Sequence, residues 1–270
     1  MIVQHNLTAM NSNRMLGITT DSQAKSTEKL SSGYKINRAA DDAAGLAISE
    51  KMRRQVRGLT QASANAQDGI SCVQTAEGAL AEVHDMLQRM NELAIMASND
   101  TMTSVDRGYI DSEVQQLKSE INRVRSTTTF NEQNLLTGEF KDKNLQVGAE
   151  AGQFIDISID DMQCSTIGIG TTSVATAEKA QTAINEIKSA LAKVSKQRSD
   201  LGAVQNRLEH TIKNLDNVVE NTTSAESAIR DTDMAKEMVR YSNNNILAQA
   251  GTSMLAQANQ ANQNVLSLLG

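Results

Sequence analysis

The sequence contains no proline and no tryptophan, and aromatic residues make up only 2% of its 270 residues. At the ordinary usage of about 5%, a chain of this length would carry roughly a dozen prolines, and most of them would break or kink a helix. The apolar residues are mostly Ala, Leu, Ile, Val and Met rather than the large aromatics of many globular cores. These absences favour long, uninterrupted helices.

The chain also lacks the features of nucleic-acid-binding, disulfide-bonded and membrane-spanning proteins. Its net charge is -6, and its one basic cluster, at residues 51–57, has no aromatic neighbours on which bases could stack. Cys72 and Cys164 are far apart and fit no metal or redox spacing. No run of about 18 apolar residues is present, and residues 1–13 do not have the pattern of a cleavable signal peptide. We therefore expect no nucleic-acid partner, no membrane span and, if the protein leaves the cell, another export route.

The segment from 184 to 219 carries the seven-residue apolar repeat of a coiled coil. One column consists of Ile187, Val194, Leu201, Leu208 and Leu215, and a second of Ile184, Leu191, Ile212 and Val219. A repeat of this length implies a rod of roughly 50 Å at about 1.5 Å per residue. Other helices must cover its apolar seam, because burial of each large side chain stabilises by roughly 1.5–3 kcal/mol only once water is excluded.

Two further segments supply matching seams. The first consists of Val73, Leu80, Leu87 and Ala94, interleaved with Ala76, Val83, Met90 and Ala97. The second consists of Ile110, Val114, Leu117, Ile121 and Val124. A short link joins them, and in it Thr103 and Asp106 have the spacing of a helix N-cap. We therefore predict a mainly α fold, an elongated antiparallel helical bundle or coiled coil.

Outside these seams the sequence predicts four local features. A first helix over residues 1–30 is expected to end at Gly33, which suits the left-handed position after a helix. Alternating isoleucines at 155, 157 and 159, preceded by glycines, predict a small β-hairpin near residues 140–162. Residues 165–176 are expected to form an extended link. Thr223 and Glu226 have capping-box spacing, so another helix is predicted to start there.

Both ends of the chain are almost free of charge. Residues 241–270 contain no charged side chain, and residues 1–13 contain none apart from His5 when it is protonated. An uncharged polar surface suits a helix that is packed on every face, because a buried charge costs several kcal/mol whereas amides can pair. We infer self-assembly with the chain ends innermost. The predicted polymerisation seam consists of Ala248, Gly251, Leu255, Ala258, Asn262, Val265 and Leu269.

Three runs of sequence resemble the bacterial flagellin family. Residues 30–48, Leu-Ser-Ser-Gly-Tyr-Lys-Ile-Asn-Arg-Ala-Ala-Asp-Asp-Ala-Ala-Gly-Leu-Ala-Ile, look like its N-terminal signature, and residues 225–235 and 264–269 look like its C-terminal domain. The middle, which carries large outer domains in many flagellins, is short here. The resemblance implies three parts. Residues 1–40 and 223–270 would supply the two helices of an inner terminal domain, and residues 41–222 a core bundle with the hairpin.

The resemblance also implies a function and partners. The chain would be a structural protein that polymerises into the extracellular filament of the bacterial flagellum for motility. It would be exported without a cleavable signal peptide by the flagellar type III apparatus, with a flagellin chaperone. A hook–filament junction protein and a coiled-coil signalling scaffold are the alternatives. The charge-free ends argue against the scaffold, since a cytoplasmic hairpin keeps charged solvent faces along its length.

We predict no catalytic residue, no metal site and no cofactor. His5, His84 and His210 lie in separate helical segments without partners at metal-ligand spacing. The scattered titratable residues therefore argue against an enzyme built on a bundle. The acidic pairs at residues 41–42 and at 231 and 233 are interpreted as helix-start electrostatics or subunit contacts.

One stripe of residues suggests a contact surface. In the heptad register Leu93 and Met96 fall outside the seam, beside Arg89. Either the bundle core is broad and the Arg is solvated, or the stripe is a contact surface. In flagellins the matching Gln-Arg-x-x-Glu-Leu-Ala segment packs between subunits and is also read by the vertebrate Toll-like receptor for flagellin. The resemblance therefore suggests as contact residues Gln88, Arg89, Glu92, Leu93 and Glu113.

Overall fold

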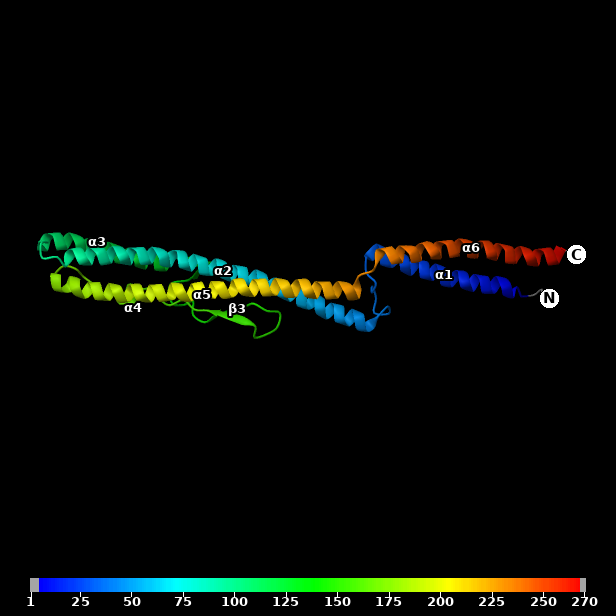
Figure 1. Cartoon of the computed structure of the whole chain (residues 1–270), viewed down its shortest axis with the longest axis horizontal. Helices are drawn as coiled ribbons and strands as arrows, with labels where there is room; N and C mark the ends of the chain where they lie inside the picture. The colour runs from blue at the N-terminus through cyan, green and yellow to red at the C-terminus, as the bar shows by residue number, and fades with distance from the viewer. Residues whose placement is uncertain (1–4, 268–270) are drawn as a thin grey trace. The chain divides into compact units, whose positions relative to one another are not determined.

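The computed structural model describes residues 5–267, and the side-chain surroundings of residues 5–260. Over this range the elements are α1 (Leu7–Ser32), α2 (Ala43–Ala97), α3 (Ser104–Thr127), β1 (Thr129–Phe130), β2 (Gln133–Asn134), β3 (Lys143–Gln146), β4 (Phe154–Ile157), α4 (Cys164–Ile167), α5 (Ala177–Arg230) and α6 (Met234–Ser267) (Figure 1). The predicted mainly α class with a small hairpin region is confirmed.

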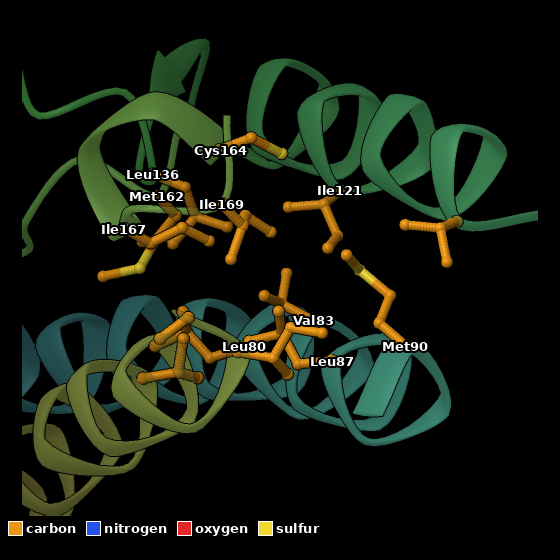
Figure 2. Close-up of a cluster of buried hydrophobic side chains, with 14 of the residues drawn as sticks. Leu80, Val83, Leu87, Met90, Ile121, Leu136, Met162, Cys164, Ile167 and Ile169 are labelled. Carbon is orange, nitrogen blue, oxygen red and sulfur yellow. The ribbon is translucent and has the colours of Figure 1, made fainter. Parts of the chain in front are cut away.

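The chain forms two compact units. We call residues 1–54 with 221–270 the terminal unit, and residues 55–220 the central unit. The core of the central unit is built on α2, whose predicted heptad columns are fully buried. The eight members are Val73, Ala76, Leu80, Val83, Leu87, Met90, Ala94 and Ala97. Figure 2 shows Met90 of α2 and Ile121 of α3 pointing toward each other inside this core.

In α5 one of the two predicted columns is fully buried, and the other packs against the edge of the core clusters. The column from Ile187 to Leu215 at intervals of seven is buried, as predicted. The members of the second predicted column, Ile184, Leu191, Ile212 and Val219, are only half-buried. The second buried column of α5 instead contains Ala183, Ala190 and Gln197. The second predicted column is therefore at the rim of the core rather than at its centre. Positions three and four residues before the first column are both its helical neighbours, and the position four residues before, which carries Ala183, Ala190 and Gln197, is the more deeply buried one.

Gln197 is buried in this core with its amide satisfied. Its Nε2 donates to the carbonyl oxygen of Ser158 at 3.0 Å, and its Oε1 accepts the N–H of Asp160 at 3.4 Å. A buried amide needs such partners, since an unpaired one costs about 1–3 kcal/mol. These two bonds anchor the segment after β4 to α5.

The ends of α1 and α3 follow the predicted capping residues. Gly33 adopts φ +76° after α1, and its N–H donates to the carbonyl oxygen of Lys29. Thr103 and Asp106 form a capping box at the start of α3, with each side chain accepting the other's backbone N–H. The sequence therefore determines these two boundaries locally.

The predicted helix start at Thr223 and Glu226 is wrong. Helix α5 continues through both residues to Arg230, and α6 begins at Met234. Asp233 provides the cap, because its Oδ1 accepts the N–H groups of Ala235 and Lys236 at 3.1 Å each. Capping-box spacing predicts a helix start only where the preceding chain is not helical, and here the helix runs on.

The predicted hairpin is confirmed as the antiparallel pair β3–β4, in which Leu145 lies opposite Ile155. The hairpin packs closely on α2 at Gly69, where an added Cβ would lie 2.3 Å from Cδ2 of Leu145. A second pair, β1–β2, was not predicted. Its two-residue turn places Asn131 and Glu132 at φ 47° and 64°.

Residues 165–176 are not the extended link that we expected. Their start belongs to the short helix α4, and Ile167, Ile169 and Val174 are buried in the core. Asp111 of α3 holds the segment by accepting the N–H of Val174 and the hydroxyl of Ser173, both at 2.8 Å. The glycine, serine and threonine content suggested an extended link, but the interspersed apolar residues decide the packing.

Candidate functional site

In the terminal unit α1 and α6 lie side by side (Figure 1). The predicted polymerisation seam is the face of α6 that meets α1, where Ala248, Gly251, Leu255 and Ala258 are half-buried. An added Cβ at Gly251 would lie 3.2 Å from Leu16 of α1. Within one subunit, this seam therefore closes a helix pair. The side chains of Asn262 and Val265, and all of Leu269, lie outside the described residues.

The seam between α1 and α6 combines small residues and the half-buried Leu16 and Leu255 with polar pairs. Asn244 Nδ2 donates to the hydroxyl of Ser22 at 3.1 Å, and Asn6 Nδ2 donates to the carbonyl oxygen of Ala258 at 3.1 Å. Ser26 of α1 is 1% exposed. Such contacts favour one register of the two helices.

Nine large apolar side chains in the described part of the two helices are exposed rather than packed in this seam. We call these the outward apolar residues: Leu7, Met10, Met15 and Ile18 of α1, and Met238, Val239, Ile246, Leu247 and Met254 of α6. Each of them is at least 50% exposed. Exposed apolar surface of this extent is typical of a surface that binds another protein.

The outward apolar residues were not predicted from the sequence. The absence of charge in residues 241–270 indicated assembly, but the apolar residues of this segment were assigned to one seam. Two pairs at a spacing of seven, Val239 with Ile246 and Leu247 with Met254, were the available signal.

A second exposed site lies on α2 and α3 in the central unit. Arg89 donates from Nε and Nη2 to Oε1 of Glu113, at 3.0 and 2.9 Å, and from Nη1 to Glu92 at 3.2 Å. The hydrogen bond to Glu113 raises the pKa of Arg89, and that to Glu92 adds to the effect. Gln88 contacts His84 one turn earlier, at 3.0 Å between the two Nε2 atoms. The structure thus brings together Arg89, Glu92 and Glu113, whereas Gln88 contacts His84 instead.

Leu93 does not belong to this exposed site. It is 1% exposed and lies in the core cluster with Leu87 and Met90, so its predicted position on an outer face is wrong. The physical reason is that α2 has neighbours on two sides, contacting α3 through Glu113 and α5 through the Glu77–Arg198 ion pair. The buried arc of α2 is therefore wider than two heptad columns. The interpretation of a broad bundle core is confirmed for this residue.

Exposed apolar residues flank the ionic group. Met96 of α2 is 44% exposed, and Tyr109 and Val105 of α3 are 72% and 61% exposed. Tyr109 and Val105 precede Glu113 by four and eight residues, so they share one face of α3 with it. We call Arg89, Glu92, Met96, Tyr109 and Glu113 the α2–α3 patch. Tyr109 was not predicted as part of it.

One member of each acidic pair, Asp42 and Asp233, acts at a helix start as predicted, whereas Asp41 caps the turn before α2 and Asp231 accepts the hydroxyl of Ser227 in the last turn of α5. Asp41 accepts the N–H groups of Asn37 and Arg38, and Asp42 accepts the N–H of Gly45 in the first turn of α2. The N–H of Arg38 contributes most to lowering the pKa of Asp41. Asp233 has the same role at α6, where the N–H of Lys236 is the first cause of its lowered pKa.

The two cysteine thiols pack in the interior. Cys72 and Cys164 are both free and buried. Burial raises the pKa of Cys72 to about 11 and also raises the pKa of Cys164. A thiol with so high a pKa is protonated at neutral pH and reacts slowly.

The described part of the chain holds no group of three or more His, Cys, Asp or Glu side chains placed to bind a metal ion. A cavity of about 430 Å³ beside α5 is lined by side chains of both charges, among them Asp161 and Lys193. Lys193 donates to the carbonyl oxygens of Thr166 and Ile167, and Asp161 pairs with Arg125, so these charges are already engaged. Within residues 5–267, no helix is long and apolar enough to cross a membrane.

Comparison with known proteins gives consistent matches. Residues 3–141 match the family described as "Bacterial flagellin N-terminal helical region", and residues 184–269 match "Bacterial flagellin C-terminal helical region". The chain is 55% identical over 271 residues to a flagellin of Halalkalibacterium halodurans. It is 51% identical over 285 residues to the flagellar filament 31.3 kDa core protein of Treponema maltophilum. Both matches cover 100% of each chain.

Solved structures are similar as well. A crystal structure of Bacillus cereus flagellin matches with a TM-score of 0.52 and 30% identity, covering 56% of this chain and 88% of that one. The structure of a putative flagellar hook-associated protein from Vibrio parahaemolyticus matches with a TM-score of 0.60, covering 71% of this chain and 100% of that one. At 14% identity, the second match concerns the fold alone.

Proposed function

The chain belongs to the bacterial flagellin family, and on that premise we propose that its outward apolar residues join copies of it into the filament used for motility. The family consists of structural proteins, and the chain is a structural subunit of the flagellar filament outside the cell. The observation that carries the proposal is the packing of α1 and α6, with mostly small residues and polar pairs in their seam and nine large apolar side chains exposed outside it. Contact with neighbouring copies would remove this apolar surface from water.

We assign the two chain ends to the inner part of the filament. In this assignment, residues 1–40 and 223–270 form the inner terminal domain, and residues 41–222 form the core domain with its hairpin. The absence of charge in residues 241–270 supports it, because the interior of a polymer excludes water from every helix face. A hook–filament junction protein remains the alternative, and the fold of the Vibrio parahaemolyticus protein is compatible with it. The full-length identity to filament proteins favours the filament.

The proposal includes an export apparatus and a chaperone as partners. A subunit that polymerises outside the cell must first cross the cell envelope, and it must do so without polymerising inside. Its outward apolar residues would have to be covered until then. The flagellar type III export apparatus and a flagellin chaperone would meet these two needs.

We further propose that the α2–α3 patch, together with Gln88, contacts a neighbouring subunit and is read on the free subunit by the vertebrate Toll-like receptor for flagellin. An exposed Arg flanked by Met96 and Tyr109 has the character of interface hot spots, which are enriched in Arg and Tyr. Leu93 is not included, because it is buried in the core.

Sedimentation and electron microscopy of the purified chain test the filament proposal. The full-length chain is expected to form sedimentable filaments of repeating subunits. Removal of residues 241–270 is expected to abolish them while the central unit keeps its helical circular dichroism. Normal filaments from the truncated chain would refute the proposed role of α6.

A further inference from the structure

The turn after α1 and the turn after α5 meet within the terminal unit, although most of the chain separates them in sequence. Tyr34 and Asp231 form an isolated antiparallel bridge. The N–H of Lys35 donates to the carbonyl oxygen of Arg230 at 2.7 Å, and the N–H of Thr232 donates to that of Gly33 at 2.9 Å. These bonds join the segment that follows α1 to the segment that precedes α6.

The side chain of Arg230 closes over this junction. Its guanidinium carbon lies 4.8 Å from the centre of the Tyr34 ring, and Nη1 donates to Oε1 of Glu50 at 2.8 Å. The side chain of Arg230 is 12% exposed, so water screens these interactions less than it does at an open surface. Arg230 is also the first cause of the lowered pKa of Glu50.

We propose that Tyr34, Glu50 and Arg230 form a clasp that makes the docking of α1 and that of α6 depend on each other. Without the clasp, α1 and α6 would be held together only by their seam and by the two backbone hydrogen bonds at the junction. Most of the large apolar side chains of the two helices lie outside that seam, so the helices would separate more easily. With the clasp closed, the C-terminal end of α1 is fixed beside the N-terminal end of α6, and pairing can proceed along the helices from there.

The terminal unit offers a matched control for this clasp. Arg53 also pairs with Glu50, at 3.1 Å, but it lies three residues along the same helix. Arg53→Gln therefore removes an ion pair of the same kind without touching the junction between the two segments. Tyr34→Phe is a second control, because it keeps the ring on which Arg230 stacks.

Hydrogen–deuterium exchange of assembled full-length filaments tests the clasp. The exchange of amides in α1 and α6 would be compared with that of residues 73–97 in the central core. Arg230→Gln and Tyr34→Leu are each expected to accelerate exchange in both helices by a similar factor, roughly tenfold, with residues 73–97 unchanged. Arg53→Gln and Tyr34→Phe are expected to behave as the wild type does.

Two results would overturn the clasp: faster exchange in only one of the two helices, or no difference between Arg230→Gln and Arg53→Gln. The assembled form rests on the proposed function, and the wild type tests that function separately. If the wild type forms no filaments, the filament proposal fails. The same comparison is then made on the soluble subunit with the same expectations. A variant that fails to assemble is likewise compared with the wild type as a soluble subunit.

Discussion

Arg89 and Glu113 join α2 to α3 through two hydrogen bonds, of 3.0 and 2.9 Å, that end on the same carboxylate oxygen. Both side chains are about half exposed, at 51% and 46%. Solvent screening makes exposed ion pairs weak contributors to stability. The ion pair therefore contributes little to stability, and its exposed charged groups remain available to bind a partner. The buried Leu93, in contrast, contributes to the stability of the core.

Arg89→Gln and Leu93→Ala are expected to separate these two roles. Arg89→Gln should move the melting temperature by no more than about 2 °C, because surface substitutions change stability little. Leu93→Ala should destabilise by about 2–5 kcal/mol, as truncation of a fully buried Leu does. Thermal melts followed by circular dichroism measure both. Equal melting temperatures for the two variants would contradict the burial of Leu93.

Leu201→Asp is expected to unfold the central unit. Leu201 is 1% exposed in the buried column of α5, and an unpaired carboxylate there costs several kcal/mol, which is comparable with the stability of a typical domain. Ser199→Asp adds the same charge at an exposed position of α5 and serves as the control. A cooperative melt that survives in Leu201→Asp, at the temperature of the control, would exclude this column from the core.

Glu132→Gly is expected to stabilise the β1–β2 turn. Glu132 has φ 64°, a left-handed conformation that costs a side-chain-bearing residue roughly 1 kcal/mol and that glycine adopts freely. The melting temperature should rise by about 2–4 °C. Glu139→Gly is the control, because Glu139 is exposed and does not have a positive φ, so glycine there should lower the melting temperature.

Acid is expected to loosen the start of α6. The N–H groups that Asp233 accepts lower its pKa below the ordinary value of 3.8. A group with a lowered folded pKa contributes stability that is complete above its unfolded pKa and is lost as pH falls through the folded pKa. Hydrogen exchange at the N-terminal end of α6 should therefore accelerate below about pH 4 beyond the intrinsic pH dependence of exchange. Asn at position 233 can still cap the helix but does not titrate, so Asp233→Asn should remove the additional acceleration of exchange at low pH. If the additional acceleration persists in Asp233→Asn, another titrating group causes it.

The heptad periodicity correctly predicted core positions where a helix packs against the same neighbours along its length. Every heptad position assigned in α2 is buried, because neighbours cover that helix on two sides. The capping box of α3 was predictable for a different reason, since Thr103 and Asp106 satisfy each other's backbone without help from distant residues. Both features depend on chemistry that lies within a few residues of sequence.

The features that could not be predicted depend on contacts between distant segments. Whether Ala183 or Ile184 is the more deeply buried residue of α5 depends on how closely the neighbouring elements approach that helix. The burial of Leu93 likewise depends on a third helix, α5, in addition to α2 and α3. The bridge between Tyr34 and Asp231 joins residues that no local pattern connects. For the outward apolar residues, the missing charges indicated assembly, but only the pairing of α1 with α6 shows which side is free.

The concentration of free subunit in equilibrium with filaments tests the central claim, that the outward apolar residues carry polymerisation. The test variant combines Ile246→Gln, Leu247→Gln and Met254→Gln, which keep good helix formers on α6. The control combines Ser242→Gln, Asn243→Gln and Ser253→Gln, at exposed positions that are already polar. Loss of three large apolar contacts should raise the free concentration at least a hundredfold or abolish filaments, and the control should assemble nearly as the wild type does. If filaments of the test variant are in equilibrium with the same concentration of free subunit as wild-type filaments, the outward apolar residues do not carry polymerisation.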